Sequence, residues 1–73
     1  MTTLEIFKRV CDEMAQGRGK TTRNLELTNG ALLSTTIIGF QPNPNLSNSI
    51  ITILDSQTGV ITEIALSQIA SIN

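Results

Sequence analysis

The stretch LELTNGALLSTTIIGFQPNPN, residues 25–45, decides the fold of this chain. Leucine alternates with polar residues up to Asn29-Gly30, and a second apolar run extends from Leu33 to Phe40. Asn-Gly between two such runs is the strongest short-range signal of a β-hairpin, because both central residues of a two-residue turn must tolerate positive φ. A proline-broken, amide-rich segment then closes the second run. The stretch predicts a bent hairpin ending in an amide-rich loop, as a small β-barrel binding module requires.

The length of the chain limits how stable one copy can be. Its 73 residues make a single domain, and a domain of this size buries only about 60% of the surface that the unfolded chain exposes. Domains this small usually gain stability from disulfides, a bound metal ion or oligomerisation. Cys11 is the single cysteine and histidine is absent, which excludes an internal disulfide and argues against a Cys/His metal site. We therefore expect a self-associating domain, residues 1–73, without a cofactor.

The charged residues are unevenly distributed along the chain, whose net charge is −1. All five basic residues lie in the first third of the sequence: Lys8, Arg9, Arg18, Lys20 and Arg23. Beyond Glu26 only Asp55 and Glu63 are charged, so the isoleucine-rich remainder is nearly uncharged. Sheet edges without charged residues aggregate unless they are paired or covered. The pattern favours an oligomer joined at its sheet edges; the alternative is a monomer whose short edges are shielded by loops.

No stretch of the sequence is typical of a membrane span or a secretory signal, because no apolar run approaches about 18 residues. We therefore expect no membrane partner and a cytoplasmic location. A lone cysteine in a helical pattern is typically a small buried hydrophobe in a reducing compartment. Cys11 is expected to be buried in this way.

Residues 2–15 have the pattern of one amphipathic helix. Thr2 and Glu5 have the spacing of a capping box. The apolar stripe that we expect to face the core repeats at helical spacing: Leu4, Phe7, Cys11 and Met14. Gly17 and Gly19 end the pattern. An isolated helix of this length is unstable in water, so it must pack against the rest of the domain.

The segment GRGKTT, residues 17–22, has the Gly-Lys-Thr that closes a phosphate-binding loop. That motif also requires an earlier glycine and a preceding strand. Here Met14 occupies the position of that glycine, and a helical pattern precedes the segment. We interpret the segment as a basic connection between the helix and the first strand.

From Arg23 onward the apolar period changes to two, which indicates strands. Five strands are expected, at residues 23–28, 31–40, 50–54, 60–66 and 69–72. Pro42 and Pro44 cannot donate to a sheet, so residues 41–48 form a loop, and residues 55–59 have turn chemistry. We predict a mainly β domain, one helix and a small antiparallel barrel. Its expected core is Leu4, Phe7, Cys11, Leu25, Leu27, Leu33, Ile37, Ile51, Ile53, Ile61 and Ile69.

One set of residues across the predicted hairpin matches the spacing of a known motif without a gap: Asn29-Gly30, Leu33, Thr35, Ile37, Gly39-Phe40, Gln41 and Asn45. It resembles the first motif of the Sm/LSm family, which includes the bacterial RNA chaperone Hfq. The second motif is matched only in its apolar framework, at residues 64–69. The resemblance implies an N-terminal helix capping a strongly bent five-stranded Sm-like (SH3-like) barrel. It also implies a homo-oligomeric ring, in which strand four pairs with strand five of the next subunit, and a phage or bacterial origin.

The sequence departs from the family at several positions of the nucleotide pocket. Gln41 stands where the family has aspartate, and Ala65 and Leu66 stand where it has arginine and glycine. The lysine and histidine of Hfq would fall at Leu66 and Ser67. Residues 41–45 include no aromatic side chain that could stack on a base. The fold and the ring assembly therefore carry over better than uridine binding does.

The sequence contains no constellation typical of an enzyme, because histidine is absent and the acidic residues are scattered. Amide side chains can hydrogen-bond the edge of a base, and single-stranded RNA presents such edges. Candidate base contacts at the family's binding loops are Gln41, Asn43, Asn45, Ser67 and Gln68. Candidate phosphate contacts are Lys8, Arg9, Arg18, Lys20 and Arg23.

Two hypotheses about function remain open at this point. The first is a ring-forming Sm-like protein that binds single-stranded nucleic acid, RNA before DNA, in RNA or DNA processing. The second is an oligomeric scaffold or protein-interaction module that has lost RNA binding, since no positive charge follows Arg23. Asn and Pro are also ordinary turn formers, and surface Lys and Arg often only solvate a helix, so each candidate residue has a purely structural alternative.

Overall fold

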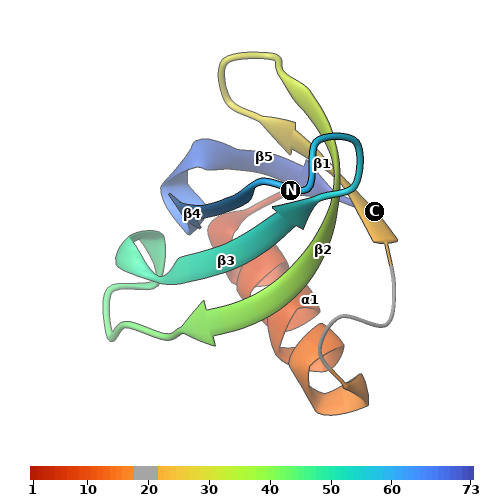
Figure 1. Ribbon diagram of the computed structural model, residues 1–73. Helices are drawn as coiled ribbons and strands as arrows, with labels where there is room; N and C mark the ends of the chain where they lie inside the picture. The colour runs from red at the N-terminus through yellow and green to blue at the C-terminus, as the bar shows by residue number, and fades with distance from the viewer. Residues whose placement is uncertain (18–21) are drawn as a thin grey trace.

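The computed structural model describes residues 1–17 and 22–73. Within them one helix precedes five strands, and two short 3-10 turns interrupt the sheet (Figure 1). The elements are α1 (Thr3–Gln16), β1 (Thr22–Leu27), β2 (Leu32–Gln41), η1 (Leu46–Asn48), β3 (Ile50–Asp55), β4 (Ile61–Ala65), η2 (Leu66–Gln68) and β5 (Ile69–Ile72). The predicted order of a helix and five strands is confirmed, and no strand or helix end differs by more than one residue.

The capping box predicted at the start of α1 is present. The Glu5 amide donates to Thr2 Oγ1 over 3.2 Å, and the Thr2 amide donates to the Glu5 carboxylate over 2.9 Å. The backbone and side-chain hydrogen bonds from Thr2 hold the pKa of Glu5 below its usual value. Gly17 follows the helix with a φ of 111°, as expected of a C-terminal glycine, whereas Gly19 lies outside the described residues.

The buried face of α1 is not the one that the leucine and cysteine spacing predicts. Ile6 and Val10 are buried, together with the carboxylate residue Glu13. Leu4 is 50% exposed and Cys11 is also exposed, so both core predictions are wrong. The predicted stripe and the stripe that is buried, Ile6, Val10 and Glu13, lie side by side on one helix. The helix is rotated so that the branched side chains of Ile6 and Val10 face the sheet. Phe7 and Met14, at the border between the stripes, are only partly buried.

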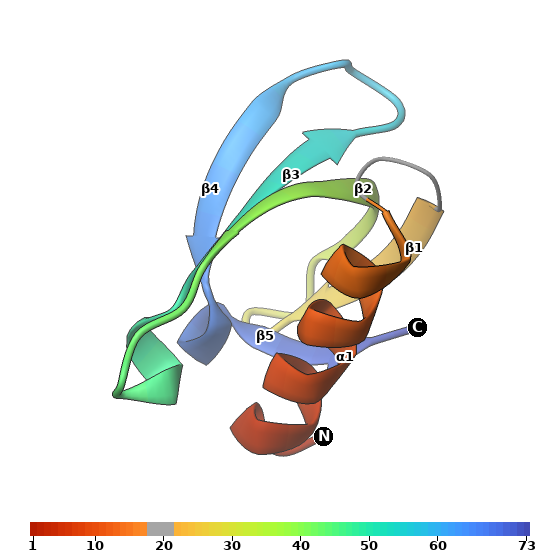
Figure 2. The same cartoon turned by 90° about the horizontal axis from the view of Figure 1, so that it is seen from below.

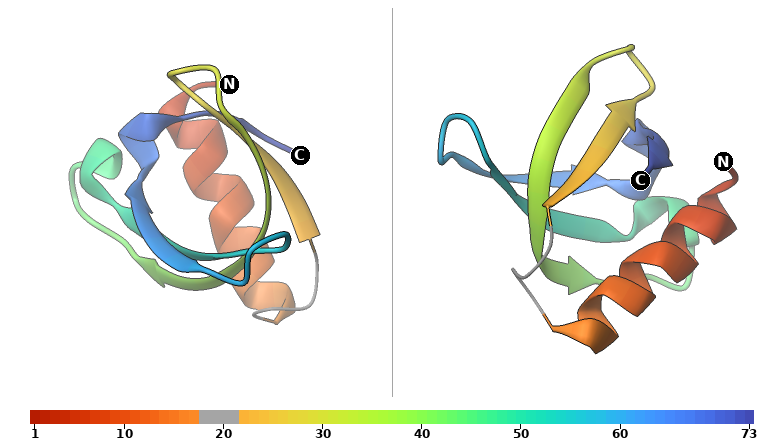
Figure 3. Two further views of the ribbon diagram at one scale, coloured as in Figure 1. Left: turned by 45° about the horizontal axis from the view of Figure 1, so that its top comes forward. Right: turned by 90° about the vertical axis from the view of Figure 1, so that its right-hand side faces the viewer.

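The strands form one antiparallel sheet in the order β4-β3-β2-β1-β5. Two register shifts, at Glu26/Leu27 and at Ile37/Gly39, mark irregularities that bend the strands. The sheet curls round on itself, and α1 lies across one end of the curl (Figures 2 and 3). Among the described residues β4 and β5 do not pair with each other, so they are the two edges of an open sheet. A bent five-stranded sheet is therefore confirmed, but it is not closed.

The β1–β2 turn has one residue more than the sequence predicts. Gly30 N donates to Leu27 O over 2.9 Å, and Leu27 N donates to the carbonyl of Ala31, also over 2.9 Å. Gly30 has a φ of 89°, whereas no described non-glycine residue has positive φ. Positive φ at Asn29 is therefore a wrong prediction: the loop is the three-residue form, in which only the last position is left-handed. Asn29 contributes through its side-chain oxygen, which accepts from Ala31 N over 2.9 Å.

The hydrophobic core fills the space between the curled sheet and α1. Its fully buried apolar residues are Ile6, Val10, Leu25, Ile37, Ile51, Ile53, Leu66, Ile69 and Ile72. Five of the predicted core residues are among them, while Phe7, Leu27 and Leu33 pack against the core half-buried. Ile61 is a wrong prediction, since it is 62% exposed. Ile61 pairs with Leu54, whereas Ile64 pairs with the buried Ile51. Because side chains alternate between the two faces of a strand, Ile64 faces the core from β4 and Ile61 does not.

A pair of matched truncations tests this core assignment. Ile51→Ala should lower the free energy of unfolding by about 2–5 kcal/mol, because the side chain is fully buried. Ile61→Ala removes the same atoms from an exposed position, so it should change the free energy by about 0.5 kcal/mol or less. Urea denaturation measures both at one fixed protein concentration, low enough for the protein to remain monomeric. Equal losses for the two variants would contradict the strand orientation.

The lowered pKa of Glu5 predicts how the capping box responds to pH. A carboxyl whose folded pKa is depressed stabilises the protein above its unfolded pKa, and that stabilisation is lost as pH falls through the folded pKa. Wild type should therefore be more stable than Glu5→Gln near neutral pH, and the difference should shrink once the pH drops below the usual value of 4.5. Thermal unfolding at a series of pH values measures this. When Thr2 is replaced by alanine, the stability difference between Glu5 and Glu5→Gln should already be small at neutral pH.

Candidate nucleic-acid interface

The amide loop between β2 and β3 is held by its own side chains. Asn43 Oδ1 accepts from Asn45 N over 2.9 Å, and Asn45 Oδ1 accepts from Ser47 N over 3.3 Å at the start of η1. Asn43 N donates to the hydroxyl of the buried Ser49 over 3.0 Å. These local bonds are those of ordinary asparagine turns. The oxygens of Asn43 and Asn45 thus shape the loop. Within residues 1–17 and 22–73 their side-chain NH₂ groups donate no hydrogen bond, so these groups are the part available to a ligand.

The second group of predicted base contacts lies beside this loop. Leu66 N donates to Ser49 O over 2.9 Å, and η1 contacts η2 at the same end of the sheet. Gln68 Oε1 accepts from Ala65 N over 3.1 Å, so this amide also supports its own turn. Ser67 is exposed. Residues 41–45 and 67–68, distant in sequence, are thus brought together, as a shared site requires.

Gln41 occupies the last position of β2 and is exposed. It pairs with Ile50 across the β2–β3 ladder, so its backbone is held in the sheet. Its side chain makes no hydrogen bond within residues 1–17 and 22–73. Together with Ser67 it is the candidate contact whose removal should disturb the fold least.

The basic residues are divided among different surroundings. Arg23 Nε lies 2.9 Å from Glu13 Oε2, in an ion pair that ties β1 to α1. Arg9 Nη2 donates to Ile72 O over 3.2 Å. Lys8 is exposed on α1, while Arg18 and Lys20 lie outside the described residues. Two of the predicted phosphate contacts therefore have structural roles within the chain.

The Glu13–Arg23 pair should matter for stability because Glu13 is only 9% exposed at its side chain. Arg23→Ala leaves a nearly buried carboxylate without its partner, which is costly for a buried pair. Since the Arg23 side chain is 34% exposed, water offsets part of that cost, and we expect a loss of about 1–2 kcal/mol. Equilibrium urea unfolding measures the effect. The double variant Glu13→Gln/Arg23→Ala should regain part of the loss, whereas an effect no larger than that of Lys8→Ala would contradict a structural role.

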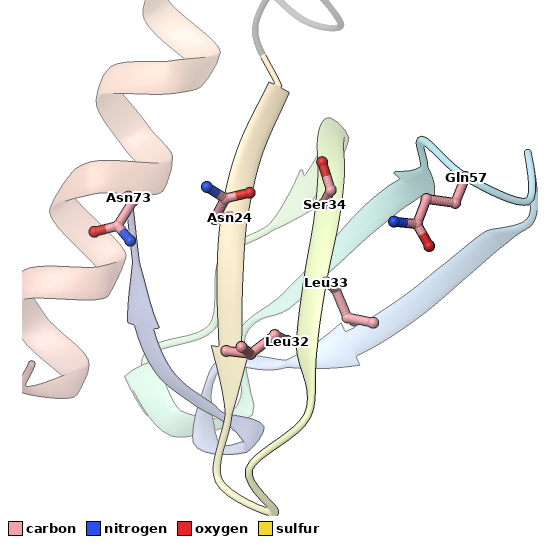
Figure 4. Close-up of a pocket in the computed structure, with 6 residues that line it drawn as sticks. All are labelled: Asn24, Leu32, Leu33, Ser34, Gln57 and Asn73. Atoms are coloured by element: carbon pink, nitrogen blue, oxygen red, sulfur yellow. The ribbon is translucent and has the colours of Figure 1, made fainter.

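A separate hollow of about 390 Å³ lies away from this interface, over β1, β2 and the β3–β4 turn. It is lined by Asn24, Leu32, Leu33, Ser34, Gln57 and Asn73 (Figure 4). None of the predicted site residues lines it. Asn24 and Ser34 are opposite each other in the β1–β2 ladder. Sequence periodicity could have placed this pair on one face, but nothing in the pattern connects Gln57 and Asn73 to it.

Two kinds of site are not found among the residues that the structure describes. Within residues 1–17 and 22–73 no group of three or more His, Cys, Asp or Glu side chains is placed to hold a metal ion. In the same part of the chain, no helix combines the length and apolar character that crossing a membrane requires. Comparison with protein-family models, with curated proteins and with solved structures gives no match for this chain. The function of this chain is therefore inferred from its own sequence and geometry.

Proposed function

We propose that this chain is an Sm-like protein that forms a homo-oligomeric ring and binds single-stranded RNA, acting in RNA or DNA processing in the cytoplasm of a bacterial or phage-infected cell. The observation that carries the proposal is the strand order, which leaves β4 and β5 as the two edges of the sheet. These are the strands that pair between subunits in the family that the sequence resembles. The motif residues from Asn29 to Asn45 lie on the β1–β2 hairpin and its following loop, as that resemblance implies.

The composition of the β4 edge supports assembly. Val60 is 56% exposed and Ile61 is 62% exposed, and Glu63 is the one charged residue of this strand. An apolar edge with unpaired N–H and C=O groups is a template for another strand. Pairing of β4 with β5 of a neighbour, repeated around a closed ring, would satisfy both edges in every subunit. The ring also supplies the burial that one copy of this small domain lacks.

The proposed RNA site is the end of the sheet where η1 and η2 meet. There the NH₂ groups of Asn43, Asn45 and Gln68 and the side chains of Gln41 and Ser67 can donate to base edges. Each contact is weak alone, and repetition around a ring would add them through avidity. Splayed bases of a single strand suit such a surface better than a duplex does.

A second candidate function is an oligomeric scaffold without RNA binding. Its support is the use of candidate groups inside the chain: amide oxygens in turns, Arg23 with Glu13, and Arg9 with Ile72. The two aromatic residues do not form a stacking platform for bases either. Phe7 and Phe40 pack edge-to-face against each other, with their ring centroids 5.3 Å apart. In this alternative the same ring would present its surface to proteins.

Fluorescence anisotropy with oligo-U, oligo-A and single-stranded DNA at low and moderate salt tests the RNA proposal. We expect saturable, salt-sensitive binding that the double variant Gln41→Ala/Ser67→Ala weakens about thirtyfold, since each of the two lost hydrogen bonds removes roughly 1 kcal/mol. Gln57→Ala, an exposed amide over the separate hollow, is the matched control and should bind like wild type.

Native mass spectrometry of the purified protein, before and after nuclease treatment, reports stoichiometry and bound nucleic acid together. A ring carrying RNA is expected before treatment. Absence of saturable binding at low salt would discard the RNA proposal. Protein partners that a pull-down still recovers from nuclease-treated lysate would favour the scaffold.

A further inference from the structure

The outer edge of β5 is already occupied by other parts of the chain. Asn73 N donates to Asn24 O over 3.0 Å, so this end of the strand bonds to β1 through alternate residues. The N–H and C=O groups of Ala70 and Ile72 consequently point the other way, toward the edge where a neighbouring strand would add.

The groups at this edge have partners from the start of α1. Arg9 Nη2 donates to Ile72 O over 3.2 Å. Met1 N donates to Ala70 O over 3.3 Å, and Ile72 N donates to Met1 Sδ over 3.5 Å. Both carbonyls and one amide at this edge are therefore bonded within the chain. A strand could not form its ladder here without displacing Met1 and Arg9.

The outer edge of β4 is different. Asp55 N donates to Val60 O and Leu66 N donates to Ser49 O, each over 2.9 Å, so even-numbered residues of this strand bond to β3. The backbone groups of Ile61 and Glu63 point outward. Within residues 1–17 and 22–73 they make no hydrogen bond, and both side chains are exposed. The two edges of one sheet are thus unequal, one open and one capped.

We propose that Met1 and Arg9 form an autoinhibitory cap on β5, which must be released before β4 of a second copy can pair there. This inference rests on the proposed ring and identifies what regulates its assembly. The incoming strand offers Ile61 and Glu63, whose free groups match those that the cap now occupies at Ala70 and Ile72. Release exchanges hydrogen bonds within the chain for hydrogen bonds between copies, and adds burial of Val60 and Ile61. Assembly therefore depends on protein concentration and on the strength of the Arg9 bond.

The cap explains why a small domain with an apolar edge need not polymerise as it is made. Arg9 donates a charge-assisted hydrogen bond, which is stronger than a neutral one, to the carbonyl nearest the end of the strand. Met1, itself 50% exposed, covers the neighbouring amide with a flexible side chain. Covering an edge in this way is a known means of preventing unwanted strand pairing.

Sedimentation velocity over a range of protein concentrations tests the cap. Arg9→Ala should lower the concentration at which half of the protein is assembled by about tenfold, the effect of losing a hydrogen bond to a charged donor. Lys8→Ala removes the same charge from the neighbouring exposed position and should behave like wild type. Assembly of Arg9→Ala that is no better than that of Lys8→Ala would show that the contacts of Arg9 do not inhibit assembly, and hydrogen exchange then decides whether the cap itself exists.

Hydrogen exchange of the Ile72 amide separates the cap from the ring. In an Ile61→Lys background, where a charge blocks the β4 edge, Arg9→Ala should still accelerate exchange of this amide about tenfold, because Arg9 and Met1 hold the same stretch of β5. Faster exchange without better assembly in the unblocked protein would support the cap and reject the ring. Unchanged exchange would reject the cap whatever the oligomeric state.

Discussion

Leu25 makes the contact on which the rest of this structure depends. In the sheet it lies opposite Leu33 on one side and opposite Ile72 on the other, and it is 1% exposed. Its strand therefore joins the long central hairpin to the last residues of the chain. Without β1 between β2 and β5, β5 would have no partner in the sheet, and α1 would lose its contacts with β5. The register shifts at Glu26/Leu27 and Ile37/Gly39 bend this sheet around its single small core.

The helix does more than complete that core. Polar bonds attach it at two places, Glu13 to Arg23 on β1 and Arg9 to Ile72 on β5. Both bonds use arginine, whose planar donors bond well in fixed directions. The ion pair with Glu13 offsets the charge of Arg23, and the bond to Ile72 O occupies a donor of Arg9 that a phosphate would otherwise accept from. Stability of the single domain and the proposed binding of nucleic acid thus compete for the same side chains.

A similar competition governs the amide loop. Asn43 and Asn45 are suited to base edges, yet a loop containing Pro42 and Pro44 has few backbone donors and depends on side-chain oxygens to hold its shape. An asparagine can do both, because its oxygen accepts locally while its NH₂ group remains a donor. The proposed binding surface therefore presents side-chain NH₂ donors. The side-chain oxygens of the same asparagines accept from the backbone and hold the loop in shape.

Local patterns in the sequence determined the capping box at Thr2 and Glu5, the five strands and the positions of the turns, because each depends on residues within a few positions of one another. The same patterns could not decide which stripe of α1 is buried, since Ile6 and Val10 compete with Leu4 and Cys11 until the sheet is present. They could not decide the side on which Ile61 lies, because apolar residues occupy both alternating sets of positions in residues 60–66. Only the tertiary structure brought the amide loop beside η2, paired Arg23 with Glu13 and placed Arg9 on β5. Those contacts join residues 10 to 63 positions apart, and no local spacing specifies them.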